Sequence, residues 1–153
     1  MKSLTLSQSE RTLSYVGIAL GLLVSFALAP KDELFLQNFS FYWGSQLAVI
    51  VLILLLRPRP AIVATLSFVL ATILLGFRIW IATRSRYRPD GGIWFLYLVL
   101  LCGAAIGGLG SAWWCHSKIN LTPARTVLIT CIATIAGSCL IAACACSTGL
   151  YCR

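Results

Sequence analysis

The 153-residue sequence has little charge: 10% of its residues are Asp, Glu, Lys or Arg, whereas 59% are hydrophobic. A soluble domain carries roughly 25% charged residues, so these charges are too few to cover a water-facing surface. Most of the chain is therefore expected to have lipid as its solvent. No polar stretch is long enough for a second domain, and residues 1–153 are predicted to form a single transmembrane domain.

Acidic residues are missing from the apolar runs. The four carboxylates of the chain belong to Glu10, Asp32, Glu33 and Asp90, all at the N-terminus or in predicted loops. Proton- and sodium-coupled carriers generally need an intramembrane carboxylate or unwound backbone carbonyls. The lack of intramembrane carboxylates argues against coupled transport, whereas a pathway for an anionic or neutral solute stays open.

The sequence also lacks an arrangement typical of an enzyme. Its one histidine, His116, directly follows Cys115, and adjacent residues on an ordered segment point in different directions. We therefore predict no catalytic site and no cofactor. The net charge of +8 does not indicate nucleic acid, because the basic residues lie at predicted helix ends and in short loops, where they contact lipid headgroups.

Seven cysteines are present, but the C-x2-C pairs common in structural zinc sites are not. Cys139, Cys144 and Cys146 near the C-terminus are the candidates for a soft metal such as Cu(I). We favour the alternative that these cysteines pack as small apolar residues, so no metal site is predicted.

Five apolar runs are present, each long enough to cross a hydrocarbon core as a helix. The alternation expected of a membrane barrel is absent. We predict an all-α polytopic integral membrane protein with short loops and five transmembrane helices, at residues 13–29, 39–56, 61–82, 93–114 and 126–150. The first two runs are the shortest, so four transmembrane helices are the alternative.

Several residues at the ends of these runs carry structural signals. Pro30 follows an Ala-Leu-Ala sequence and is expected to block signal-peptide cleavage, which keeps the first run as a span. Asn38 is a predicted N-cap, and Tyr42 belongs to an aromatic cluster predicted to lie at the membrane interface. Pro60 and Pro123 suit the first turn of the helices that follow.

Two stripes of small residues run along the predicted helices with a spacing of four. Their members are Gly17, Gly21, Ser25 and Ala29 in the first stripe, and Gly103, Gly107 and Ser111 in the second. Small side chains at this spacing let helix backbones approach closely. Either the stripes pair with each other within the chain, or one of them contacts a protein partner or a second copy of the chain.

The main concentration of charge lies between the third and fourth runs and consists of Arg78, Arg84, Arg86 and Arg88. Arg78 is the only charged residue within a predicted span, which makes it a candidate contact for an anion or a partner. The alternative that we favour is a side chain that snorkels to the interface beside Trp80.

The positive-inside rule does not decide the orientation. Five spans place six Lys and Arg residues on the N-terminal side and six on the other. The first helix usually dominates, which favours a cytoplasmic N-terminus in a bacterial inner (plasma) membrane. The arginine-rich stretch then faces outward as a docking surface, whereas in the opposite orientation it is an inside anchor.

These features favour a non-enzymatic membrane interaction protein that binds or inhibits a membrane-active partner. An immunity protein against a pore-forming toxin is a concrete instance, because that role needs spans and a docking surface but no catalytic set. The first alternative is a channel or transporter subunit for an anionic or neutral solute, with Arg78 and Gln46 lining its path. The second alternative is a thiol-metal handling membrane protein.

Overall fold

The computed structural model of the chain describes residues 2–83, 91–117 and 121–147, and these residues form five helices with no strand among them. The helices are α1 (Lys2–Leu28), α2 (Phe35–Leu54), α3 (Pro60–Thr83), α4 (Gly91–Ser117) and α5 (Pro123–Ser147). The all-α class predicted from the sequence is confirmed. Of the described helices, four are long and apolar enough to cross a membrane: α1, α3, α4 and α5.

Helix α2 is not among these four, because polar residues interrupt its apolar run. It has 20 residues, but Gln37, Asn38 and Ser40 lie in its first two turns and Gln46 lies in its middle. The described helices therefore supply four spans of the required length and hydropathy, the smaller of the two numbers expected. Of these polar side chains, Gln46 is buried among neighbouring helices, whereas Gln37 and Ser40 are exposed.

The proline signals place helix starts correctly. Helix α3 begins at Pro60 and α5 begins at Pro123, since a proline at the first position loses no intrahelical hydrogen bond. Thr122 caps α5 by accepting a hydrogen bond from the Arg125 N–H at 3.4 Å. This contact is the side-chain cap that the Thr-Pro pair predicts.

The start of α2 differs from its prediction. Asn38 lies inside the helix, which already begins at Phe35. The preceding turn is formed by Asp32, whose carboxylate accepts the Leu34 N–H at 3.1 Å and whose carbonyl accepts the Phe35 N–H at 3.0 Å. The prediction that Asn38 is the N-cap is therefore wrong, because Asp32 starts the turn earlier.

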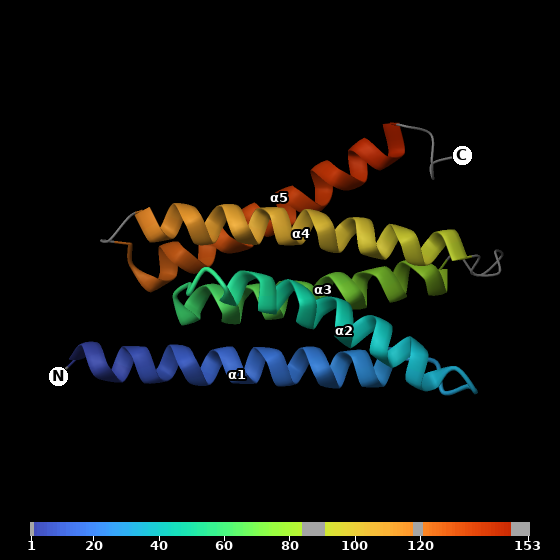
Figure 1. Ribbon diagram of the computed structural model, residues 1–153, viewed down its shortest axis with the longest axis horizontal. Helices are drawn as coiled ribbons and strands as arrows, with labels where there is room; N and C mark the ends of the chain where they lie inside the picture. The colour runs from blue at the N-terminus through green and yellow to red at the C-terminus, as the bar shows by residue number, and fades with distance from the viewer. Residues whose placement is uncertain (1, 84–90, 118–120, 148–153) are drawn as a thin grey trace.

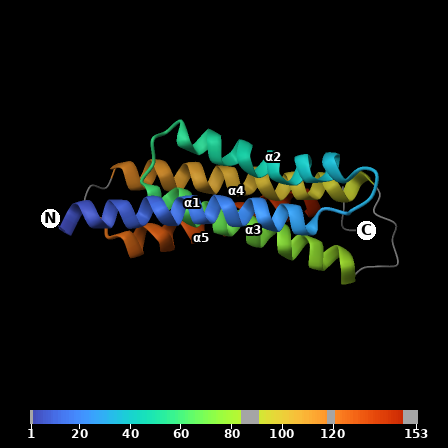
Figure 2. The same cartoon turned by 90° about the horizontal axis from the view of Figure 1, so that it is seen from below.

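The helices lie side by side along the long axis of the molecule, and helix α3 is central (Figures 1 and 2). Helices α1, α2, α4 and α5 all contact it, and the two most extensive pairings are α4 with α5 and α1 with α3. Helix α5 crosses α4 and diverges from it toward its C-terminal end (Figure 1). One end of the bundle is here called the N-terminal end (Figure 1). It contains the start of α1, the α2–α3 connection, the C-terminal end of α4 and the start of α5.

The core follows from the position of α3. Its residues Ile62, Leu66, Leu70 and Leu74 recur every four residues and are at most 1% exposed. The outer helices instead expose large apolar side chains, such as Leu23 of α1 and Leu140 of α5. In an integral membrane protein such side chains face lipid, because an apolar surface there costs nothing.

Candidate functional site

A buried polar cluster lies among α2, α3 and α4, and it consists of Tyr42, Gln46, Arg78 and Tyr97. The Gln46 side-chain amide donates a hydrogen bond to the Tyr97 hydroxyl at 3.2 Å. Gln46 and both tyrosines are at most 1% exposed. This bond joins α2 to α4. It also satisfies two buried polar side chains, and each would lower the stability of the fold if it had no hydrogen-bond partner.

The Tyr42 hydroxyl has a different environment. Its oxygen is buried and has no hydrogen-bond partner of ordinary geometry among the described residues. The partly buried Arg78 lies close enough to interact with this hydroxyl electrostatically. The cluster therefore places a cationic guanidinium beside a buried hydroxyl that has hydrogen-bonding capacity to spare.

Aromatic rings enclose these polar groups. The Tyr42 and Tyr97 rings meet edge to face with centroids 6.0 Å apart. The ring centroid of Phe77 of α3 lies 5.3 Å from that of Tyr97, and the ring centroid of Trp94 of α4 lies 5.5 Å from that of Tyr42. Phe77 and Trp94 therefore pack against the two tyrosines and join α2, α3 and α4 through aromatic contacts.

The sequence indicated only part of this cluster. Arg78 and Gln46 were expected on one path. In the structure Arg78 lies beside Tyr42 and Gln46 bonds to Tyr97, and the two tyrosine rings contact each other. Tyr42 was expected in an aromatic cluster at the membrane interface, but its side chain is fully buried in the bundle and does not face lipid. Tyr42 lies on the same face of α2 as the buried Gln46, Val49 and Ile53. This spacing gave no sign of burial in the sequence, because residues that face lipid are as apolar as residues that face the protein interior.

The other arginines of the predicted contact surface, Arg84, Arg86 and Arg88, lie outside the described residues. Trp80 is partly exposed, and its ring stacks on that of Phe77 with centroids 6.2 Å apart. Trp80 therefore lies on the same turn of α3 as Arg78.

The two small-residue stripes do not contact each other. A Cβ atom on Gly17 would lie 3.1 Å from the Ser67 Cβ of α3, and one on Gly21 would lie 3.1 Å from the Gln46 Oε1 of α2. A Cβ on Gly103 would lie 2.5 Å from the Gly137 carbonyl oxygen of α5. The alternative in which the stripes pair with each other is wrong, because α3 and α2 cover the first and α5 covers the second.

The remaining members of the stripes are also placed against neighbouring helices. A Cβ on Gly107 would overlap the Ala133 backbone of α5. Ser25 and Ser111 are buried, and the Ser25 hydroxyl has no hydrogen-bond partner among the described residues. A protein partner would therefore contact faces other than these stripes.

A third stripe, of hydroxyl side chains, was missed in the sequence. Its members recur every four residues on α5 and are nearly or fully buried: Thr126, Thr130, Thr134 and Ser138. The Ser138 hydroxyl donates to the Leu100 carbonyl oxygen of α4 at 3.1 Å. The regular spacing was visible in the sequence, but short hydroxyl side chains also bond to their own helix and give no sign of their neighbours.

Two of the three candidate metal ligands have side chains that the structure describes. Cys139 and Cys144 are exposed free thiols, and the Cys146 side chain lies outside the described residues. Within the described ranges, no group of three or more His, Cys, Asp or Glu residues is placed to hold a metal ion. Cys115 is buried whereas His116 is exposed, so the two side chains have different surroundings.

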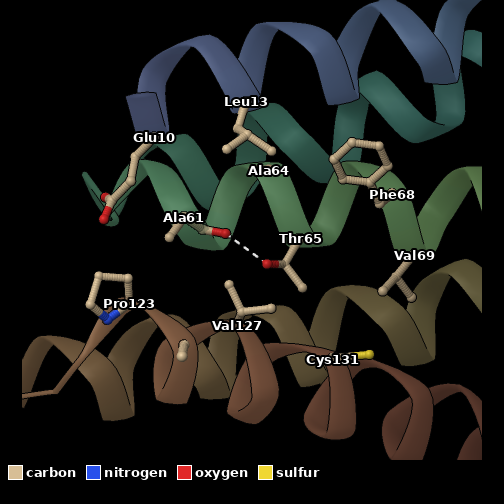
Figure 3. Close-up of a pocket in the computed structure, with 11 residues that line it drawn as sticks. Glu10, Leu13, Ala61, Ala64, Thr65, Phe68, Val69, Pro123, Val127 and Cys131 are labelled. Carbon is tan, nitrogen blue, oxygen red and sulfur yellow. Dashed lines mark hydrogen bonds between the residues drawn. The ribbon is translucent and has the colours of Figure 1, made fainter. Parts of the chain in front are cut away.

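A groove of about 380 Å³ opens between α1, α3 and α5 (Figure 3). Its lining is apolar except for Thr65, whose hydroxyl donates to the Ala61 carbonyl at 2.8 Å, and Glu10. Figure 3 shows Leu13 and Phe68 on one wall and Val127 on the other, with Glu10 near the end of the groove. The groove combines small floor residues, apolar walls and one carboxylate.

Comparison with known proteins found no family model that matches the sequence, no similar curated protein and no similar solved structure.

Proposed function

We propose that the chain is a non-enzymatic membrane interaction protein that binds a transmembrane helix of a partner in the groove between α1, α3 and α5. The observation that carries this proposal is the groove itself, which is apolar and lies between helices of membrane-spanning length. Binding in lipid depends on close packing rather than on hydrophobic burial, so a preformed concave surface favours association.

The shape of the groove suits a helix. Ala61 and Ala64 of α3 and Ala124 of α5 line it, and these small side chains let another backbone approach. Leu13, Phe68 and their neighbours supply larger apolar walls. The partner segment in this proposal presents its own small residues to the alanines and its larger side chains to the walls.

The charge of the groove specifies the partner further. Glu10 is the one charged residue among the described residues that line it, and it lies within the polar start of α1. A carboxylate near the membrane boundary attracts a basic side chain, and the attraction is stronger there than in bulk water. We therefore expect the partner helix to carry a Lys or Arg residue at the same boundary.

Photo-crosslinking from Val127, which lines the groove, tests the proposal against Ile132, an exposed α5 residue that does not. Partners identified from Val127 are then tested for co-purification in mild detergent. We expect Ala124→Leu, which fills the groove, to abolish co-purification. Ala136→Leu, on an exposed part of the same helix outside the groove, should leave it unchanged.

Two results would contradict the proposal. Crosslinks from Val127 to lipid alone would identify an acyl chain as the occupant. Equal co-purification with Ala124→Leu and Ala136→Leu would place the partner on another surface.

An immunity protein that protects a bacterial inner membrane from a pore-forming toxin is one instance of this function. In that case the bound helix belongs to the toxin, and the N-terminus lies in the cytoplasm. Expression should protect sensitive cells, and Ala124→Leu should remove the protection while Ala136→Leu keeps it. Labelling of a cysteine at Ser85 from outside intact cells tests the orientation.

The buried polar cluster favours a second candidate function, passage or binding of an anionic or neutral solute. Arg78 beside the buried Tyr42 hydroxyl is the observation behind it. Flux measured in liposomes should then fall on Arg78→Ala but not on Arg125→Ala, an exposed arginine of α5. Absence of selective flux in the unmodified chain would remove this candidate.

A further inference from the structure

A small basic pocket of about 140 Å³ lies at the N-terminal end of the bundle, between the α2–α3 connection and the last turns of α4. Its lining consists of Arg57, Pro58, Arg59, Ile62, Ala112, Cys115 and His116. Two of these side chains are permanently cationic, a third is an imidazole, and none of the lining residues is acidic. The pocket therefore has the polarity of an anion site.

The backbone of the connection brings the two arginines to the same pocket. The N–H groups of Leu56 and Arg57 donate to carbonyls of the last turn of α2, at 3.0 and 2.9 Å. Arg57 then adopts a φ of 48°, in the left-handed region, which turns the chain out of the helix. Pro58 follows, and α3 begins two residues later at Pro60.

Arg59 is held in a defined position. Its Nη1 donates a hydrogen bond to the Leu121 carbonyl oxygen at 2.9 Å, which ties the α2–α3 connection to the segment before α5. A guanidinium carries five N–H donors in a planar fork. It can therefore hold this carbonyl and an oxyanion together, and the first bond orients it for the second.

The position of the pocket across the membrane is indicated by residues next to it on α4. Trp113 and Trp114 are 76% and 55% exposed, and they lie between the pocket residues Ala112 and Cys115 in sequence. Exposed tryptophans near the end of a membrane helix lie at the level of lipid headgroups. The pocket therefore lies at the depth where lipid phosphates are found.

We propose that the basic pocket binds a phosphate-bearing anion, which accepts hydrogen bonds from Arg57 and Arg59 and contacts His116. The anion is either the headgroup of an anionic phospholipid or free inorganic phosphate. The site is independent of the groove and of the partner proposed for it, because the pocket and the groove share no lining residue.

The test uses the full chain in two arms. In the first, the chain is reconstituted in phosphatidylcholine vesicles with a minor fraction of phosphatidylglycerol, extracted gently, and analysed by native mass spectrometry for retained lipid. In the second, inorganic phosphate is titrated into the chain in phosphatidylcholine nanodiscs, and tryptophan fluorescence reports binding. Retention of phosphatidylglycerol assigns the site to lipid, and saturable phosphate binding without lipid retention assigns it to the free anion.

The key variant is Arg57→Asn, because asparagine tolerates the left-handed conformation and removes the charge. It leaves the Arg59–Leu121 bond untouched. We expect it to weaken binding about tenfold, the loss of one charge-assisted hydrogen bond. Arg11→Gln, which removes an exposed cation of α1 that does not line the pocket, should bind as the unmodified chain does.

A fold control accompanies both variants, namely their thermal unfolding temperatures in the same detergent. If Arg57→Asn unfolds early, His116→Asn replaces it, since this exposed side chain lines the pocket from α4. Equal binding by Arg57→Asn, His116→Asn and Arg11→Gln would overturn the proposal. So would a first arm that retains no phosphatidylglycerol together with a second arm that shows no saturable phosphate binding.

Discussion

The α4–α5 pair and the α1–α3 pair each pack along a stripe of small residues. The two helices approach more closely in the α4–α5 pair than in the α1–α3 pair. Between α4 and α5 glycine meets backbone, and a Cβ on Gly103 would lie 2.5 Å from the Gly137 carbonyl oxygen. Between α1 and α3 the contact is looser, since a Cβ on Gly17 would lie 3.1 Å from the Ser67 Cβ and 3.2 Å from the Ala64 carbonyl oxygen. The residue opposite the stripe, and not the stripe itself, therefore sets how closely two helices approach.

Both pairs contain an interhelical hydrogen bond from a serine hydroxyl to a backbone carbonyl of the opposite helix. Ser138 of α5 donates to the Leu100 carbonyl of α4 at 3.1 Å, and Ser14 of α1 donates to the Pro60 carbonyl of α3 at 2.7 Å. Each hydroxyl also lies 3.0 Å from a carbonyl of its own helix. The polar contact is thus common to both pairs, and the glycine contact distinguishes them.

The largest expected effect breaks the closer pair. In Gly107→Leu the new side chain would overlap the Ala133 backbone of α5, and a backbone cannot rotate away as a side chain can. We expect a loss of about 3 kcal/mol or more in the free energy of unfolding. The measurement is unfolding in detergent micelles by titration with sodium dodecyl sulfate, followed by circular dichroism.

The matched control for this substitution is Gly110→Leu on the same helix. Nothing lies within 4 Å of a Cβ at Gly110, so the added side chain meets open space that lipid fills. Its free energy of unfolding should equal that of the unmodified chain or exceed it by up to about 1 kcal/mol, the gain in helix propensity. An equal loss in both variants would mean that the effect is general to α4 and not due to its contact with α5.

A smaller change compares the two pairs directly. Gly103→Ala and Gly17→Ala each add one methyl group, and each gains about 1 kcal/mol of helix propensity. We expect Gly103→Ala to be destabilised by about 2 kcal/mol overall, because its methyl group would meet backbone, and Gly17→Ala to stay within about 1 kcal/mol of the original chain.

Gly76→Ala is the reference for this comparison, because nothing lies within 4 Å of its Cβ position. It isolates the helix-propensity term from the packing term. Unfolding free energies that rank Gly17→Ala below Gly103→Ala would reverse the order of closeness inferred for the two pairs.

The smallest expected effect concerns the interhelical serine hydrogen bond that both pairs contain. Ser138→Ala and Ser14→Ala each remove an interhelical hydrogen bond, which in membrane proteins is worth about 0.6 kcal/mol. The two losses should be similar. Ser117→Ala, which removes only a bond from an exposed serine to its own helix, should cost less, and unfolding titrations of all three variants in parallel provide the measurement.

Much of the fold could be predicted because it depends on local properties of the chain. A backbone in lipid must satisfy its own hydrogen bonds, so long apolar runs become helices whatever their neighbours are. Pro60 and Pro123 begin helices for a reason contained in their own rings. Asn38 failed as a cap because a second local signal, Asp32, began the turn first.

The candidate sites could be predicted only in part. Gln46 and Arg78 were visible as the polar residues of apolar runs, yet their shared neighbours Tyr42 and Tyr97 were not. A tyrosine suits both the interface and a polar interior, and its sequence position alone does not distinguish them. The groove and the basic pocket each combine residues from three or more segments, so no local pattern encodes them.

The sequence by itself determined that the described chain is helical, that its helices are long enough for a membrane and where two of them begin. The tertiary structure decided which faces meet: α5 against the second glycine stripe, α3 and α2 against the first, and Tyr42 inside the bundle. The physical reason is that lipid and protein interior are equally apolar. Hydrophobic periodicity therefore carries little information about which face turns inward, and only the steric and polar fit between helices selects it.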